Sequence, residues 1–153
     1  MNIPDDLSRI FANSLEEVVF TVAGVTLRVL PPECEADEAG KEMIGIMHLN
    51  GRNRGMLFIS AAEDSIRALC AAMLGIPQHE VAKDDMRDAL CELVNMTAGN
   101  AKLRLSNTDY TFTLTVPFLI SGENMMIFTK KREPILSCVL SDDRVSLGMK
   151  MTY

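Results

Sequence analysis

Residues 84–105 read DDMRDALCELVNMTAGNAKLRL, and this stretch decides how the rest of the chain is interpreted. Its apolar residues recur at steps of three and four, the spacing of a helix that buries much of its circumference. Asp88, Glu92, Asn95 and Gly99 follow one another at steps of four, three and four. At about 100° per residue, they fall within a strip about 60° wide. We therefore predict a long helix, buried on several sides, whose polar strip faces outward.

Two residues of this strip are unfavourable for the helix itself. Glycine costs about 1 kcal/mol relative to alanine in a helix interior, and asparagine is a poor helix former. Gly99, lacking a side chain, would leave room for a loop of another protein to reach the Asn95 amide. Glu and Asn at this spacing are also common on ordinary solvated helix faces, so ELVN alone does not establish a site. Asn100 and Arg104 project into the apolar sector, which predicts that the helix runs past the edge of the core near its end.

The flanking sequence predicts an α+β fold. Helical periodicity extends over residues 4–22 and 61–74, and the second of these helices is ended by Gly75 and Pro77. Strand-like alternation covers residues 25–30, a hairpin at 43–60, and four later stretches at 110–117, 125–130, 134–140 and 145–151. This order lacks a regular βαβ alternation. We expect about three helices, including the long one with the ExxN pattern, packed on a mostly antiparallel sheet.

Composition limits the class of protein. A chain of 153 residues fits one domain, which we expect to span residues 1–153. No apolar run approaches the roughly 20 residues that a membrane-spanning helix needs, and no export signal is recognisable, so we expect a cytoplasmic protein. The net charge of -6 and the lack of a basic cluster larger than residues 130–132 argue against nucleic-acid binding. Four scattered cysteines without a CxxC pair favour reduced thiols over a zinc site.

Three stretches together carry a family resemblance: SIRALCAAMLG, DALCELVNMTAGNAKLRL and TVPFLISG. They resemble the CheX branch of the CheC/CheX/FliY family of chemotaxis phosphatases, and the similarity extends over most of the chain. The resemblance implies dephosphorylation of CheY-like response regulators, often by a dimer joined through sheet edges. It places the catalytic acidic and amide positions on Glu92 and Asn95, and a preceding polar position on Asp88.

CheC-like proteins carry a second ExxN pattern on the first helix. In this chain Glu16 and Glu17 are followed three residues later by Val19 and Phe20. We therefore expect a single site, as in CheX-like members.

The implied reaction requires few catalytic groups from this chain. A phosphoaspartate is an activated acyl phosphate, and the partner's acidic pocket would supply Mg²⁺, so we expect no intrinsic cofactor or metal. Asn95 would orient a water for in-line attack, and the resemblance suggests that Glu92 pairs with a lysine of the regulator. Asp88, Gly99 and Lys102 are the candidate contacts with the partner. A homodimer is expected from the resemblance and from sheet edges that need covering.

Alternative functions remain open from the sequence. The chain could bind a response regulator and sequester it without hydrolysis, using the same helix face. A flagellar switch component is a weaker interpretation, because such proteins usually carry an additional rotor domain. An unrelated enzyme is weaker still, because the sequence has no Gly-rich phosphate loop, no GxSxG and no Cys/His pair at recognisable spacing.

Overall fold

The computed structural model describes residues 3–31, 42–123, 125 and 136–153. The centre of its sheet is a long antiparallel hairpin. Strands β2 (Met43–Gly51) and β3 (Arg54–Ala61) pair along their whole length. The connection at Arg52 and Asn53 lies within the hairpin predicted at residues 43–60. Further strands extend the sheet on both sides of this hairpin.

The described strands form a seven-stranded sheet in the order β1-β6-β7-β3-β2-β4, with β5 also paired to β2. Every recorded strand pair is antiparallel. The remaining strands are β1 (Arg28–Val29), β4 (Phe112–Leu114), β5 (Phe118–Ser121), β6 (Leu136–Ser141) and β7 (Ser146–Thr152). The predicted α+β class with a mostly antiparallel sheet is confirmed.

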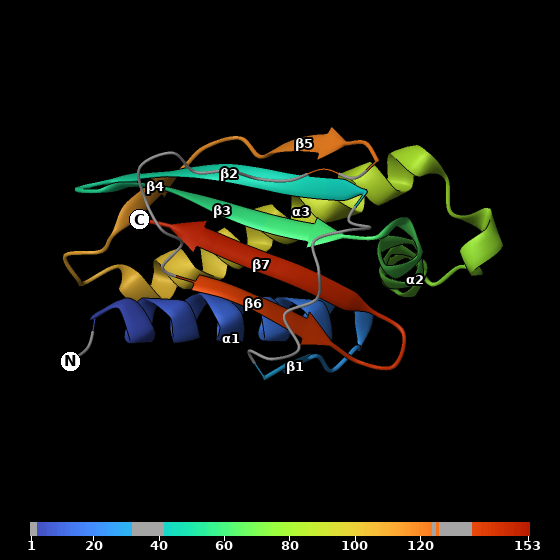
Figure 1. The fold of residues 1–153 in the computed structure, drawn as a ribbon, viewed down its shortest axis with the longest axis horizontal. Coiled ribbons are helices and arrows are strands. Elements are labelled where there is room, and N and C mark those ends of the chain that lie inside the picture. Colours follow the sequence, from blue (N-terminus) through green and yellow to red (C-terminus); the bar gives the residue numbers. More distant parts are fainter. Residues whose placement is uncertain (1–2, 32–41, 124, 126–135) are drawn as a thin grey trace.

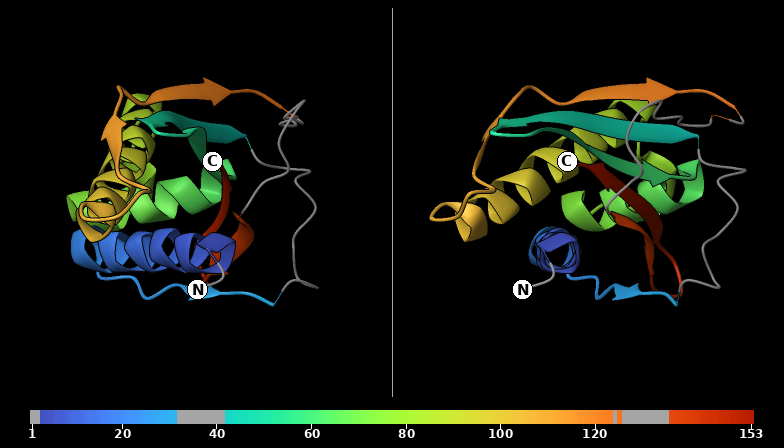
Figure 2. Two further views of the ribbon diagram at one scale, coloured as in Figure 1. Left: turned by 90° about the vertical axis from the view of Figure 1, so that its left-hand side faces the viewer. Right: turned by 60° about the vertical axis from the view of Figure 1, so that its left-hand side comes forward.

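Three α-helices lie among the described residues: α1 (Ile3–Ala23), α2 (Glu63–Leu74) and α3 (Lys83–Leu105). The two long helices, α1 and α3, lie side by side on one face of the curved sheet, as Figures 1 and 2 show. Helix α2 contacts both of them, and a short 3-10 turn, η2 (Gln78–Glu80), leads into α3. Gly75 ends α2 in the left-handed conformation, with φ of 67°, as its position in the sequence predicted. None of the described helices combines the length and the apolar character needed to span a membrane.

Helix α3 packs closely on the hairpin. A Cβ atom placed on Gly45 of β2 would lie 2.7 Å from Cγ2 of Val94 and 3.2 Å from Cγ of Leu90. Only a residue without a side chain fits between strand and helix at that distance. Leu90, Leu93 and Val94 are completely buried in the main core, so the inner face of α3 is fixed in position.

The strand predictions needed two corrections. The predicted strand at residues 110–117 is shortened to β4 at Phe112–Leu114, and after a break the chain forms β5 at Phe118–Ser121, where no strand was predicted. Pro117 lies at the break, where its missing N–H cannot contribute to a ladder. The predicted strand at residues 25–30 is reduced to Arg28–Val29, which pairs with β6. Apart from Met125, the predicted strand at 125–130 lies outside the described residues, as does the basic run at 130–132.

Candidate functional site

Helix α3 begins and ends with charges that suit its dipole. Asp84 and Asp85 lie in its first turn, and a carboxylate oxygen of Asp85 accepts a hydrogen bond from the backbone N–H of Ala82 at 2.9 Å. Lys102 and Arg104 lie in its last turn, near the negative end of the dipole. The helix predicted at residues 84–105 is therefore present, and it begins one residue earlier, at Lys83.

The polar strip of α3 faces outward, as predicted. Asp88 and Glu92 are exposed, while Asn95, Gly99 and Lys102 are partly exposed. The intervening positions on the opposite side of the helix are buried: Met86, Ala89, Leu90, Leu93, Val94, Thr97, Ala98, Ala101 and Leu105. The structure thus places all five residues that the sequence singled out on one side of a single helix.

The strip has few partners inside the chain. Within the part of the chain that the structure describes, no hydrogen bond or ion pair is recorded for the side chains of Asp88, Glu92, Asn95 or Lys102. Neighbouring polar residues on α3 are engaged: Arg87 pairs with Asp84, and Asn100 bonds to α1. Carboxylate and amide groups that are held on a rigid helix and lack partners can bind groups from another molecule.

Gly99 differs from the glycines that packing requires. A Cβ atom at Gly99 would meet nothing within 4 Å, whereas at Gly45 it would collide with Val94. The backbone of Gly99 also does not use a positive φ, which among the described glycines is recorded for Gly24 and Gly75. This chain's own fold therefore gives no reason for a glycine at this position of α3.

The strip is an exposed helix face. A cavity of about 250 Å³ lies near the first turn of α3, beside Lys83, Met86 and Arg87, but none of the strip residues lines it. An exposed helix face suits contact with another macromolecule better than enclosure of a small substrate. No group of three or more potential metal ligands occurs among the described residues.

Cys91 is the cysteine nearest to the strip in the sequence, and it is half-buried. Burial, together with the nearby Asp88 carboxylate, raises the pKa of its thiol. The thiol therefore stays protonated at neutral pH and is a poor nucleophile. The chemistry of the strip is that of its carboxylates and its amide.

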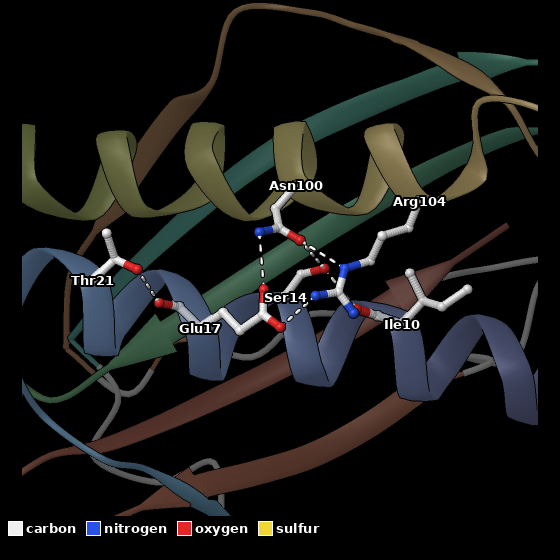
Figure 3. Close-up of polar contacts among 6 residues, drawn as sticks. All are labelled: Ile10, Ser14, Glu17, Thr21, Asn100 and Arg104. Atoms are coloured by element: carbon white, nitrogen blue, oxygen red, sulfur yellow. Dashed lines mark hydrogen bonds and ion pairs between the residues drawn. The ribbon is translucent and has the colours of Figure 1, made fainter.

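Behind the strip, a polar network joins α3 to α1 (Figure 3). The amide nitrogen of Asn100 donates to Glu17 at 3.3 Å, and Arg104 donates to the amide oxygen of Asn100 at 2.9 Å and forms an ion pair with Glu17. The hydroxyl of Ser14 lies 3.1 Å from the same amide oxygen. The hydrogen bonds from Arg104 and then Asn100 lower the pKa of Glu17.

This network corrects the expectation that α3 runs past the edge of the core at Asn100 and Arg104. Leu105, at the end of the helix, is only 3% exposed, so α3 stays packed to its last residue. Asn100 and Arg104 interrupt the apolar pattern because they face the neighbouring helix α1. The sequence did not reveal this contact, because it depends on how two helices 80 residues apart are aligned.

Leu103 was not among the residues singled out from the sequence. Its side chain is 77% exposed, and it follows Gly99 by one further step of four along the strip. At about 100° per residue it lies within about 20° of Glu92 around the helix. A helical projection of the sequence therefore already places the apolar Leu103 beside the polar strip.

Comparison with known proteins gives consistent matches. The family model for chemotaxis phosphatase CheX matches residues 43–141, which include all of α3. A curated relative, the CheY-P phosphatase CheX of Thermotoga maritima, is 24% identical over 115 residues, which cover 74% of each chain.

Solved structures of similar proteins have the same fold. The chemotaxis protein CheX from Vibrio vulnificus superposes with a TM-score of 0.83 at 23% identity, covering 99% of this chain and 98% of that one. A chain in the crystal structure of a CheX–CheY–BeF3–Mg²⁺ complex from Borrelia burgdorferi gives a TM-score of 0.76 at 19% identity, covering 94% of this chain and 95% of that one.

Proposed function

This chain belongs to the chemotaxis phosphatase CheX family, and from that premise we propose that it hydrolyses the phosphoaspartate of a CheY-like response regulator. The observation that carries the proposal is the strip on α3. Glu92 and Asn95 lie on an exposed face of a rigidly packed helix, and no partner is recorded for either side chain in the described parts of the chain. In this proposal both groups enter the site of another protein.

Asn95 is the proposed water-positioning residue. A carboxamide can accept a hydrogen bond from a water through its oxygen while its NH₂ group donates elsewhere. Phosphoryl transfer depends mainly on positioning and charge stabilisation, and an amide that holds water in line with phosphorus supplies the positioning. The amide carries no charge, so it approaches a phosphoryl group without repulsion.

Glu92 has a different proposed role. A carboxylate beside a phosphoryl dianion is repelled unless a cation lies between them. We assign Glu92 to pairing with a lysine of the regulator, so that the ion pair fixes the orientation of the two proteins. Removing Glu92 should therefore weaken binding as well as hydrolysis.

The metal in this proposal belongs to the partner. The comparison complex from Borrelia burgdorferi contains Mg²⁺ together with CheX and CheY. In our proposal the regulator's acidic pocket holds the Mg²⁺, and this chain contributes no metal ligand and no cofactor of its own. Asp88 and Lys102 are proposed contacts with the regulator at the two ends of the strip, and Gly99 gives the partner access to Asn95.

A homodimer is proposed from family likeness and from the sheet edge. Among the described strands, β5 pairs with β2 alone, and a strand edge that is not paired can join another chain. Light scattering on the purified protein should give about twice the chain mass of 16.9 kDa. A mass of one chain would contradict the dimer and leave the phosphatase proposal unaffected.

The phosphatase proposal is tested by turnover. A purified CheY-like receiver domain, phosphorylated with a small phosphodonor, is incubated with this protein at a small fraction of its concentration. We expect phosphate release to accelerate through many turnovers. A sequestering protein would instead slow release or require stoichiometric amounts, and either result would refute the proposal.

A further inference from the structure

Leu103 is an exposed leucine in the last turn of α3, aligned with the candidate site. Its side chain is 77% exposed, more than the other exposed large hydrophobic residues of the described helices, Phe20 at 60% and Leu74 at 53%. It lies one step of four beyond Gly99, on the side of the helix that carries Glu92. A single exposed leucine needs no explanation by itself, so its significance depends on its place.

We propose that Leu103 is an apolar anchor that docks against the receiver domain of the response regulator and so sets the affinity for the substrate. The inference rests on the proposed function, because it identifies a contact made by the same helix face. Leu103 does not reach the reacting atoms in this proposal. Its role is to hold the partner while Asn95 acts.

The distances along the helix fit a single interface. A rise of about 1.5 Å per residue puts Leu103 about 12 Å from Asn95 and about 16 Å from Glu92 along the axis of α3. A protein interface of standard size buries about 800 Å² on each partner, a patch about 16 Å in radius. An interface centred on Asn95 therefore extends as far as Leu103.

The residues around Leu103 favour contact with a protein. Gly99 lies between Asn95 and Leu103 on the strip, and a Cβ there would have nothing within 4 Å, so the partner can approach the helix backbone between the amide and the leucine. Lys102 and Arg104 flank Leu103 in the chain, and they would form a charged border around it. An apolar centre with a polar rim is the usual composition of a protein interface.

The partner is a receiver domain and not a membrane or a second copy of this chain. Leu103 shares its helix face with two carboxylates, Asp88 and Glu92, which an anionic lipid surface would repel. In our dimer proposal the second copy pairs along β5, whose Ser121 shares a cavity with Lys83 and Met86 at the start of α3, whereas Leu103 lies in the last turn of that helix. The helix face remains for the substrate protein.

The test compares two substitutions at Leu103 with a control on another helix. Leu103→Gln keeps the length of the side chain and a good helix former but removes its apolar character, and Leu103→Met keeps that character. Leu74→Gln is the control, because Leu74 is also an exposed leucine at the C-terminal end of a helix. Initial rates of phosphate release are measured against the concentration of phosphorylated receiver domain, with thermal unfolding of each variant measured in parallel.

We expect Leu103→Gln to raise KM about fivefold, which corresponds to about 1 kcal/mol, while kcat stays within about twofold. Leu103→Met and Leu74→Gln should leave KM within about twofold of the parent value. An unchanged KM in Leu103→Gln, or a lower kcat at unchanged KM, would overturn the anchor while leaving the phosphatase proposal intact.

Phosphate release by the parent protein, together with a binding titration, shows whether the proposed function itself has failed. If the parent protein does not accelerate phosphate release, affinity for the phosphorylated receiver domain is measured directly by titration. Weaker binding by Leu103→Gln than by Leu74→Gln would then support the anchor without catalysis. Absence of binding by the parent protein would overturn both inferences.

Discussion

Gly99→Ala should make the protein more stable and less active. Gly99 lies inside α3, its backbone does not use a positive φ, and an added Cβ would have open space around it. Alanine is favoured over glycine in a helix interior by about 1 kcal/mol. For a chain of about 150 residues, this corresponds to a rise of about 2–4 °C in Tm. Thermal and denaturant unfolding measure this part of the prediction.

The loss of activity has a separate cause. The new methyl group would project from the strip beside Asn95, where we propose that the regulator approaches the helix. A displacement of about 1 Å between reacting groups can cost on the order of 10²-fold in rate. We therefore expect kcat/KM for dephosphorylation to fall by about that factor, although the variant is more stable than the parent.

Gly45→Ala is the matched control for the effect on stability. Its Cβ would lie 2.7 Å from Cγ2 of Val94, in the packed contact between β2 and α3. Overpacking of this kind costs about 1–3 kcal/mol. The same substitution should therefore have opposite effects on stability at these two glycines.

Two results would refute the reasoning. If Gly99→Ala keeps full activity, the glycine does not provide access to Asn95. If Gly99→Ala lowers the free energy of unfolding, the space around Gly99 is not open in the folded protein. Activity and the free energy of unfolding are measured separately, so each result can be recognised independently of the other.

The remaining predictions concern the amide, the carboxylate and the helix contacts. Asn95→Ala should abolish accelerated phosphate release while leaving affinity for the phosphorylated receiver nearly unchanged, whereas Glu92→Ala should weaken both; full activity of Asn95→Ala in a phosphate-release assay would exclude the water-positioning role. Because Arg104 lowers the pKa of Glu17 below its ordinary value of 4.5, the Glu17 carboxylate stabilises the fold above that pH and loses this effect as the pH falls through its lowered pKa. Denaturant unfolding from about pH 5 towards pH 3 should therefore show a steeper loss of stability in the parent than in Glu17→Gln, and parallel curves would contradict the contribution of this pair. The hydroxyl of Thr97 is buried without a hydrogen-bond partner among the described residues, so Thr97→Val should raise the free energy of unfolding by about 1 kcal/mol, as measured by denaturant unfolding, without changing activity.

The long helix could be predicted because its signals are local. The apolar residues at helical spacing, from which the helix was predicted, are all contained within residues 83–105. The alignment of Asp88, Glu92 and Asn95 then follows from helix geometry alone. That these side chains face outward also followed, since the apolar residues occupy the other sectors.

The parts that could not be predicted depend on contacts between distant segments. Phe118–Ser121 forms a strand by pairing with residues 43–46 of β2, a segment far away in the sequence. Asn100 and Arg104 looked like errors in the apolar pattern, because their partners Ser14 and Glu17 lie on the first helix. Sequence periodicity identifies the buried side of a helix but not which polar residues meet across an interface.

The packing of α3 suggests why a phosphatase with so few groups can work. Side-chain amides and carboxylates on a flexible loop would lose conformational freedom when they enter the partner's site, and that loss would reduce affinity and rate. Here the helix is fixed by close contact with β2 on its inner face and by the Glu17–Arg104 pair at its end. The backbone that carries Asn95 is therefore held in place, and no side-chain hydrogen bond is recorded for Asn95 within the described residues, so its amide need not break such a contact before it binds water. The packing of α3 holds the backbone of Asn95 in place before the partner binds. In our proposal the phosphate and the metal belong to the partner, and the fold of this chain contributes to catalysis through this helix.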